Sequence, residues 1–479
     1  MRTANGEETK NRVLFFEDGN MEQIGIFELD YLEQGIACTA CVFENPSAAT
    51  VPSGPSSSPA PSRSHGRSSG LGVSGSGSSA GSEYFVVGTA HVVAEEKEPS
   101  RGRILVFEVM ENRRVHLIAE KEVKGAVFSL AMVCGRLVAG VGSKVQVFTL
   151  ANGAEDQTNF TGQPELQLEC SHTNQIMSLY LKVKGEHVIV GDLVRSITLL
   201  RYKPEERTLQ EVARDFNSSY QRAVEILDGA SDDIYVGADI HGNLQCLRHV
   251  ADAVTDEERC KLESCGEFHL GEFVNAFHRG SLVGQPIDAD TSAGSSGSTV
   301  SATPSSGVAA STGKSIFGAD YVSVTGLKAG SSSVLFGSVS GAIGNIISLS
   351  EDSHRFFVAV ERVMKRTVIS IGSLNHKEWR SFQNDLRNAP QRNMIDGDLV
   401  EMILEFDRAQ LEAVVREIND EVNATISALN VDSTSASKAN GSSVVTTSST
   451  GNMLLHLATN KVEFTVEDVL RRVEDISRL

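Results

Sequence analysis

One short pattern, repeated five times along the chain, constrains the fold most strongly. Each copy is an apolar run that ends in glycine, followed after a turn by a second apolar run. Successive glycines are 46 to 52 residues apart, except for a last interval of 100 residues that contains the Ser/Gly-rich stretch 286–315. Repeated strand pairs at this period are typical of β-propeller blades. The glycines are Gly88 in YFVVG, Gly140 in RLVAG, Gly191 in VIVG, Gly237 in IYVG and Gly337 in VLFG.

The repeats lack the Gly-His and Trp-Asp dipeptides of standard WD-repeat blades. We therefore predict a mainly-β chain in which residues 1–350 form a degenerate, WD-like, seven-bladed β-propeller. Inside the long last interval, TDEERCKLES (255–264) is predicted to form a helix capped by Thr255.

The spacing of the apolar residues changes beyond Ser350. They then recur three or four positions apart, which is the spacing of one helix face. Thr465, followed by Asp468 three residues later, predicts a capped helix start, and two further helices are predicted at IDGDLVEMILEF and AQLEAVVREIN. We predict a small α-helical C-terminal domain at residues 351–479. Its helical-face residues are Phe357, Val360, Met364, Val368 and Ile371, then Val466, Val469, Val473 and Ile476.

Three Ser/Gly-dominated stretches interrupt the patterned sequence, at residues 46–82, 286–315 and 432–452. They hold too few large apolar residues to offset the conformational entropy lost on folding, so we predict disorder there. Each stretch lies between well-patterned segments. We therefore interpret them as surface insertions into a fold and not as linkers between domains.

The chain is acidic, with a formal net charge of −19 and a pI near 5.1. Sequence-independent binding of phosphates needs a basic surface, so free DNA or RNA is not the expected main ligand. The start, MRTANGEETKNRV, lacks the apolar core of a signal peptide, and no run reaches the ~18 to 20 apolar residues of a membrane span. The seven cysteines follow no disulfide framework. We expect a soluble intracellular protein without a membrane partner.

No motif in the sequence predicts catalysis. GVAASTGKS (307–315) resembles a phosphate-binding loop, but Gly307 stands one position too early for the required spacing. Cys38 and Cys41 lie in the strand-like GIACTACVFE, where side chains three apart point to opposite faces, so we do not expect zinc. No metalloprotease motif or nucleophile elbow is found. We predict no enzyme activity, catalytic residue, cofactor or metal.

One local stretch is basic: KEWRSFQNDLRNAPQR (377–392), which contains the only tryptophan, Trp379. It could contact nucleic acid, or it could be a connector whose Trp379 packs between the propeller and the helices. We favour the connector because the net negative charge of the whole chain opposes nucleic-acid binding. Charge reversal at Arg380 and Arg387 would test the first interpretation.

Several long phrases carry a family resemblance. Among them are YFVVGTAHVVAEEKEPSRGRILVFEV, IMSLYLKVKGEHVIVGDLVRSITLLRYKPEE, FHLGEFVNAFHRGSLV and IDGDLVEMILEF. They resemble the C-terminal third of the damage-specific DNA-binding protein 1 family, adaptors of a cullin-RING ubiquitin ligase. The resemblance runs from about Arg12 to Leu479, interrupted mainly by the three insertions. The large subunit of the cleavage and polyadenylation specificity factor and a splicing factor share this architecture.

The resemblance implies a third propeller and helical domain that serve a non-enzymatic adaptor, which binds WD-repeat substrate receptors. It links the chain to DNA damage recognition and repair, in the nucleus and also the cytoplasm. The family's first propeller completes the receptor cleft and its second holds the cullin, and neither is present in this chain. We therefore expect a fragment of a longer adaptor, or a separate polypeptide that supplies them. The alternative is a subunit of an mRNA cleavage, polyadenylation or splicing complex. DNA or RNA would be reached indirectly, through the complex.

The resemblance also implies a partner-binding site. The positions that match the family's cleft contacts are Arg195 in GDLVRS, Tyr220 in DFNSSY, and Phe273 and Asn275 in GEFVNAF. Arg195 would stand on a blade turn, where its guanidinium can cap carbonyls or pair with carboxylates. Tyr220 replaces the family's usual tryptophan and keeps an aromatic anchor with less area to bury. Alternatively, Arg195 is a solvated turn residue, Phe273 a core residue and Asn275 a turn former.

Overall fold

The computed structural model describes residues 10–43, 83–151, 164–228, 232–280, 333–369, 371–439 and 463–477. The chain divides into two compact units. The first comprises residues 1–226 and 250–262, and the second comprises residues 227–249 and 263–479.

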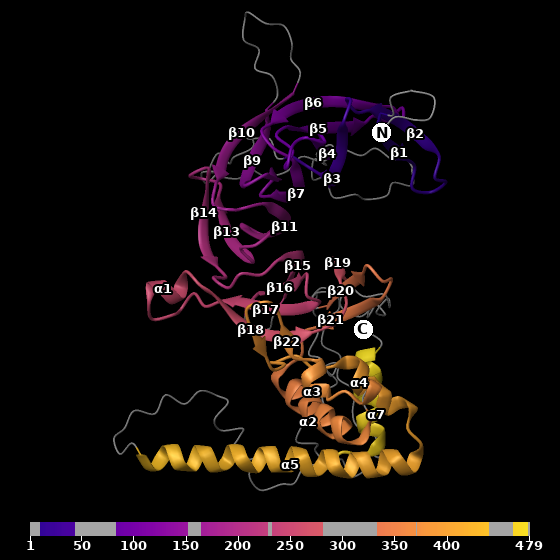
Figure 1. Ribbon diagram of the computed structural model, residues 1–479, viewed down its shortest axis with the longest axis vertical. Helices are drawn as coiled ribbons and strands as arrows, with labels where there is room; N and C mark the ends of the chain where they lie inside the picture. Colours follow the sequence, from indigo (N-terminus) through magenta and orange to yellow (C-terminus); the bar gives the residue numbers. More distant parts are fainter. Residues whose placement is uncertain are drawn as a thin grey trace, which may run out of the picture. The chain divides into compact units, whose positions relative to one another are not determined.

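Three consecutive four-stranded antiparallel sheets form the body of the first unit (Figure 1). The first strands of these blades, β3, β7 and β11, contact one another in sequence, and so do the fourth strands, β6, β10 and β14. This is the arrangement of neighbouring propeller blades. The strands are β3 (Glu33–Cys41), β4 (Tyr84–His91), β5 (Gly102–Val109) and β6 (Val115–Val123); β7 (Val127–Val133), β8 (Arg136–Val141), β9 (Lys144–Ala151) and β10 (Glu165–His172); and β11 (Ser178–Lys184), β12 (His187–Asp192), β13 (Ile197–Lys203) and β14 (Thr208–Arg214).

The repeated glycines lie in the second strands of the blades, where the next blade comes closest. A Cβ on Gly88 would lie 2.5 Å from Val127 Cγ1, and one on Gly140 would lie 2.5 Å from the Ser178 backbone oxygen. Both neighbours belong to the first strand of the following blade. The sequence repeat therefore marks close backbone approach between blades.

The first unit also contains a two-stranded ribbon, β1 (Arg12–Phe16) with β2 (Gln23–Glu28), the strand β15 (Gln221–Leu227), and the short helix α1 (Asp256–Arg259). The Thr255 side chain accepts a hydrogen bond from the Glu258 amide, so the predicted cap is confirmed. The helix is shorter than the predicted 255–264 because β18 begins at Leu262.

Two antiparallel sheets and a small strand pair belong to the second unit. Strands β16, β17 and β18 are consecutive in one four-stranded sheet, β19–β20–β21 form the second sheet, and β22–β23 form the pair. The second strands β16 and β20 carry Gly237 and Gly337, as the repeat predicts. The strands are β16 (Ile234–Asp239), β17 (Asn243–His249), β18 (Leu262–His269), β19 (Val274–Arg279), β20 (Ser333–Ser338), β21 (Ile343–Ile347), β22 (Phe382–Gln383) and β23 (Asn388–Ala389).

The helices of the second unit share one apolar core. Phe357, Val360 and Met364 on α2 are buried in it, as are Val469 and Val473 on α7, which confirms these parts of the predicted helical faces. The predicted face over 357–371 is too long, because α2 ends at Thr367, Val368 is extended, and Ile371 lies in a separate 3₁₀ turn. Thr465 and Asp468 exchange hydrogen bonds at the start of α7, as predicted. The helices are α2 (Glu351–Thr367), α3 (His376–Trp379), α4 (Gly397–Glu401), α5 (Arg408–Ala439) and α7 (Val466–Ser477), with short 3₁₀ turns η2 (Ile371–Ser373) and η3 (Met402–Glu405).

The predicted fold class, a mainly-β propeller-like chain followed by a small helical part, is confirmed. The number of seven blades and the domain limits 1–350 and 351–479 remain predictions. The insertions 46–82 and 286–315, together with the GVAASTGKS loop, lie outside the described residues.

The third predicted insertion needs a partial correction. Residues 432–439 belong to α5, whereas residues 440–452 lie outside the described part of the chain. The segment 432–439 contains neither glycine nor proline, and the first glycine stands at Gly441, so the backbone can continue the helix to Ala439.

Candidate partner-binding surface

A buried aspartate builds the loop that carries Arg195. Asp192, at the end of β12, is fully buried, and its carboxylate accepts four backbone hydrogen bonds. Oδ1 accepts from the amides of Val194 and Arg195, both at 2.9 Å, and Oδ2 accepts from those of Ile176 and Met177 at 2.7 and 3.0 Å. One side chain thus ties the β12–β13 loop to the loop that precedes β11, and it fixes where Arg195 leaves the blade.

The Arg195 side chain is exposed on this loop and is held from one side. Its Nη1 donates to the backbone oxygen of Asn174 at 2.8 Å and to the Asn174 Oδ1 at 3.0 Å. No described residue accepts from Nε or Nη2 of Arg195. The guanidinium therefore already caps one carbonyl of its own chain and keeps further donors for other groups.

A charged network stands behind Asn174. The Asn174 amide donates to Glu211 Oε2 at 3.0 Å, and Arg214 donates to both oxygens of Glu211. His172, with Nε2 3.5 Å from Glu211 Oε2, is the main cause that lowers the pKa of Glu211 to about 2; Arg214 and Asn174 lower it further, and burial opposes them. Glu211 remains ionised near neutral pH and orients Asn174 toward Arg195.

Buried polar side chains join the Arg195 loop to the β14–β15 loop, which carries Tyr220. The Ser196 hydroxyl donates to Asp215 Oδ2 at 2.8 Å, and the Gln221 amide donates to the Ser196 hydroxyl at 3.5 Å and to the Ser219 hydroxyl at 3.0 Å. The backbones are joined as well, since the Ser219 amide donates to the Val194 oxygen and the Ser196 amide to the Ser219 oxygen. The structure thus brings the loops of Arg195 and Tyr220 together.

Tyr220 is 39% exposed, and no described residue hydrogen-bonds its hydroxyl. The same loops expose three further large apolar residues that sequence reasoning missed: Phe216 is 65% exposed, Ile176 46% and Leu193 37%. Phe216 could have been noticed, because a phenylalanine inside the polar turn ARDFNSSY has no blade face to fill. We name Arg195, Tyr220, Phe216, Ile176 and Leu193 the loop surface.

Phe273 and Asn275 lie in the second unit, at the start of β19. Phe273 is 53% exposed and therefore not a core residue. Asn275 is exposed and sits inside the strand, at a register shift between Val274 and Ala276, so it is a bulge residue and not a turn former. Val339, 66% exposed, lies beside them, because its amide donates to the Phe273 oxygen at 2.8 Å.

The basic stretch 377–392 connects parts of the second unit. Arg380 is buried and donates to both carboxylate oxygens of Asp396, at 2.6 and 3.0 Å. Arg387 donates to Glu267 Oε1 at 2.6 Å. Trp379 packs edge-on against His269, with ring centroids 5.6 Å apart. These arginines are held by carboxylates, which favours the connector over a nucleic-acid contact.

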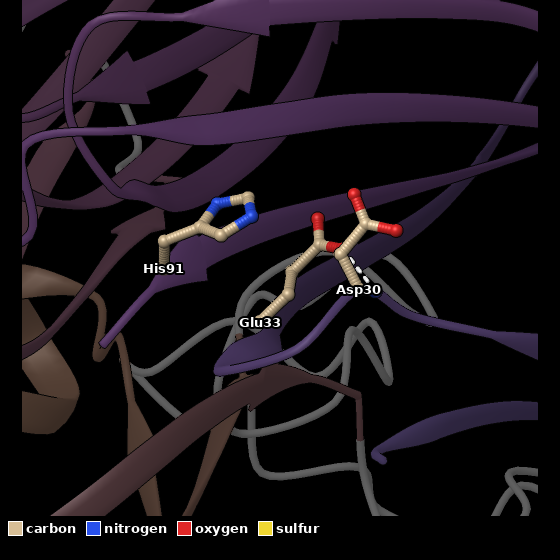
Figure 2. Close-up of side chains that lie close together, drawn as sticks. All are labelled: Asp30, Glu33 and His91. Carbon is tan, nitrogen blue, oxygen red and sulfur yellow. Dashed lines mark hydrogen bonds between the residues drawn. The ribbon is translucent and has the colours of Figure 1, made fainter. Parts of the chain in front are cut away.

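One cluster of the first unit has the residue types of a cation site. Asp30, Glu33 and His91 place ligand atoms within 4.8 Å of one another (Figure 2). However, Arg103 Nε donates to Glu33 Oε1 at 2.8 Å, Arg103 Nη2 also contacts Glu33, and Thr89 donates to the same Oε1. Burial alone would raise the pKa of Glu33, but these hydrogen bonds outweigh it and lower the pKa. We interpret the cluster as an ion pair that joins β3, β4 and β5.

The cysteines of the Cys-x-x-Cys pair differ in environment, as the strand pattern predicts. Cys38 is exposed on β3, whereas Cys41 is buried, and burial raises its pKa to about 12. The thiolate that zinc requires is therefore disfavoured at Cys41. Among the helices of the described residues, none is both long and apolar enough to cross a membrane.

Comparison with known proteins shows which family and which proteins the sequence of this chain resembles. Residues 11–405 match the family model of the CPSF A subunit region. DNA damage-binding protein 1a of Arabidopsis thaliana is 39% identical over 339 residues, which are 71% of this chain and 27% of that protein. DNA damage-binding protein 1 of Solanum lycopersicum is 35% identical over 85% of this chain and 30% of that protein. DNA damage-binding protein 1 of Oryza sativa subsp. japonica is 40% identical over 70% of this chain and 26% of that protein. This chain spans less than a third of the length of these relatives.

Proposed function

Because the chain belongs to the CPSF A subunit region family, we propose that it acts as a non-enzymatic adaptor that binds other proteins through its blade loops. The relatives named DNA damage-binding protein 1 support this role. The observation that carries it is the loop surface. There, an arginine with unused donors stands among large apolar side chains that are exposed in the described structure.

The chemistry of the loop surface suits a protein ligand. Arginine and tyrosine are enriched among the residues that dominate binding free energies, since each combines an apolar body with a polar end. Asp192 and Asn174 fix the position of Arg195 before binding, so less conformational entropy is lost when a partner docks. A helix end that offers carbonyls, or a segment with a carboxylate, would satisfy the free Nε and Nη2 donors.

We further propose the more specific role that the relatives suggest. The chain would correspond to the third propeller and C-terminal part of a cullin-RING ligase adaptor linked to DNA damage. Its partners would be WD-repeat substrate receptors, bound through Arg195, Tyr220, Phe273 and Asn275. A cullin would be held only through propellers that this sequence does not contain. Purified chain should therefore not retain purified cullin, and its recovery with cullin would contradict the proposal.

The family model supports a second candidate, because its description is that of a cleavage and polyadenylation factor subunit. In that case, the same fold would hold protein subunits near a pre-mRNA. The two candidates differ in their partners and not in their chemistry.

The deciding experiment is to purify the tagged chain from its native cells and to identify the associated proteins by mass spectrometry. Cullin and WD-repeat receptor peptides would support the ligase role, with other propellers supplied in trans or on a longer product. Endonuclease, polyadenylation or splicing subunits would contradict it and support the RNA-processing role. A chain that carries no stoichiometric protein partner would contradict both.

A further inference from the structure

Two exposed side chains of the loop surface stand on different loops. Arg195 belongs to the β12–β13 loop, and Phe216, which is 65% exposed, belongs to the β14–β15 loop. An exposed side chain loses conformational entropy when a partner binds it, unless its own protein already holds it in place. The contacts that hold Arg195 and Phe216 therefore bear on how the loop surface binds.

On one side, a chain of hydrogen bonds leads from Arg195 to Glu211 on β14. Arg195 Nη1 donates to Asn174 Oδ1 at 3.0 Å, and Asn174 Nδ2 donates to Glu211 Oε2 at 3.0 Å. The amide group of Asn174 is planar, so an acceptor that fixes its nitrogen also fixes the oxygen that Arg195 meets. Glu211 thus sets the position of Arg195 through one intermediate residue.

On the other side, the same carboxylate holds the arginine that lies over Phe216. Arg214 Nε donates to Glu211 Oε1 at 2.5 Å, and Arg214 Nη2 donates to Glu211 Oε2 at 2.7 Å. The guanidinium carbon of Arg214 lies 5.8 Å from the centroid of the Phe216 ring, within the range of a cation–π contact. A guanidinium bound by two parallel hydrogen bonds presents a fixed face to the ring. One carboxylate therefore links both exposed side chains.

Glu211 could instead serve only to join neighbouring blades. His172 on β10 has its Nε2 3.5 Å from Glu211 Oε2, and β10 contacts β14. That role would need only the contact with His172. Arg214 lies on the same strand as Glu211, three residues along, and so joins no second blade. The contacts with Asn174 and Arg214 lead away from the blade contact toward the exposed side chains.

We propose that Glu211 is a positioning residue that couples Arg195 to Phe216, so that a protein partner binds the two loops as one unit. The proposal rests on the partner-binding role proposed above for the loop surface. The partner segment would present a carboxylate or free carbonyls to Arg195 and an apolar side chain to Phe216 at the same time. A partner that met only one loop would gain less, because the contact that it made would not order the other loop.

The first experiment measures the positioning without a partner. In the isolated full-length chain, the order parameters of the Nε–H bonds of Arg195 and Arg214 report how firmly each guanidinium is held. Glu211→Gln should lower both below about 0.6, the range of flexible groups. A neutral amide has only one acceptor oxygen, so it cannot accept two parallel bonds from Arg214. Asn174→Ala should lower the order parameter of Arg195 alone, since Glu211 still holds Arg214.

The matched control is Glu186→Gln, which removes an exposed ion pair with Arg201 on the same blade. It changes the same residue type and the same charge but does not touch Asn174 or Arg214. The order parameters of Arg195 and Arg214 should stay as in the wild type.

The second experiment measures the coupling with a purified WD-repeat substrate receptor. If removing one exposed side chain loosens the other, Arg195→Ala and Phe216→Ala together should raise Kd less than the product of their separate effects. We expect a shortfall of at least about fivefold in the wild-type background. In the Glu211→Gln background, the two effects should multiply within about twofold, because the link between the loops is already broken.

Unchanged order of Arg195 in Glu211→Gln, or an equal loss of order in the Glu186→Gln control, would overturn the positioning role, and this measurement needs no receptor. Effects of Arg195→Ala and Phe216→Ala that multiply in the wild-type background would overturn the coupling. If each single variant still weakened binding, the partner-binding role of the loop surface would stand. A Kd that responds to neither single substitution would contradict that role and the coupling together.

Discussion

Replacing Arg380 by methionine should destabilise the second unit severely. The guanidinium is 6% exposed and makes two hydrogen bonds to Asp396, and its Nη1 donates to the backbone oxygens of His269 and Leu270 at 3.3 and 3.1 Å. Asp396 is 4% exposed and would keep only its contact with His376, at 2.8 Å. Removing one partner of a buried ion pair costs about 3–5 kcal/mol, because it leaves an uncompensated charge.

The pKa of Asp396 determines how the stability lost in the Arg380→Met variant depends on pH. Burial tends to raise this pKa, but hydrogen bonds from His376 and Arg380 outweigh it, and the pKa lies below its ordinary value. Without the hydrogen bonds from Arg380, the effect of burial is opposed less, and the pKa of Asp396 rises. The variant should therefore lose most stability near neutral pH, and less in acid, where protonation of Asp396 removes the buried charge.

Urea unfolding followed by Trp379 fluorescence measures this effect directly, since the only tryptophan of the chain stands beside Arg380. A loss of about 4 kcal/mol at a slope of about 2 kcal/mol per molar would shift the midpoint by about 2 M. The control is Arg362→Met, which removes an exposed ion pair to Glu421 and should cost less than about 1 kcal/mol. Equal midpoints for the two variants would refute the reasoning, and so would strictly additive losses in Arg380→Met/Asp396→Asn.

Three further predictions follow from particular contacts. Gly140→Ala should destabilise the first unit by about 1–3 kcal/mol in thermal unfolding, because the new Cβ meets the Ser178 oxygen, whereas Gly35→Ala, with its nearest neighbour 3.8 Å away, should be neutral or slightly stabilising. Glu211, with its pKa lowered to about 2, contributes stability that is present above its ordinary pKa and lost as pH falls toward 2. In Glu211→Gln, the free energy of unfolding should therefore fall less between neutral and acidic pH than in the wild type, by at most about 3 kcal/mol. Arg195→Lys should leave the free energy of unfolding unchanged within about 0.5 kcal/mol. It should still weaken partner binding, because a lysine lacks the planar set of donors with which the guanidinium can bond Asn174 and a partner at the same time.

The parts of the fold that are set by local pattern could be predicted from the sequence. The strand pairs around Gly88, Gly140 and Gly191, the Thr255 cap and the Thr465–Asp468 cap all depend on residues close together in the chain. Such short-range signals need no knowledge of the tertiary structure.

Features that depend on distant residues could not be predicted. The partner of Arg380 is Asp396, 16 residues away and beyond two strands, so the sequence favoured a connector but could not show which carboxylate binds this arginine. The bulge at Asn275 depends on the register with β20, across residues 281–332, which lie outside the described structure. The joining of the Arg195 loop to the Tyr220 loop through Val194, Ser196 and Ser219 follows from which strands are neighbours, and a sequence pattern does not state that.

The most direct test of the adaptor role is a titration of the purified chain with a purified WD-repeat substrate receptor, repeated with Arg195→Glu. The control is Arg201→Glu, on β13 of the same blade, which removes an exposed pair with Glu186 away from the loop surface. The proposed role predicts that Arg195→Glu weakens binding at least about tenfold, or about 1.4 kcal/mol, while the control binds like the wild type. Equal affinity of the wild type and Arg195→Glu, or equal losses in both variants, would contradict it.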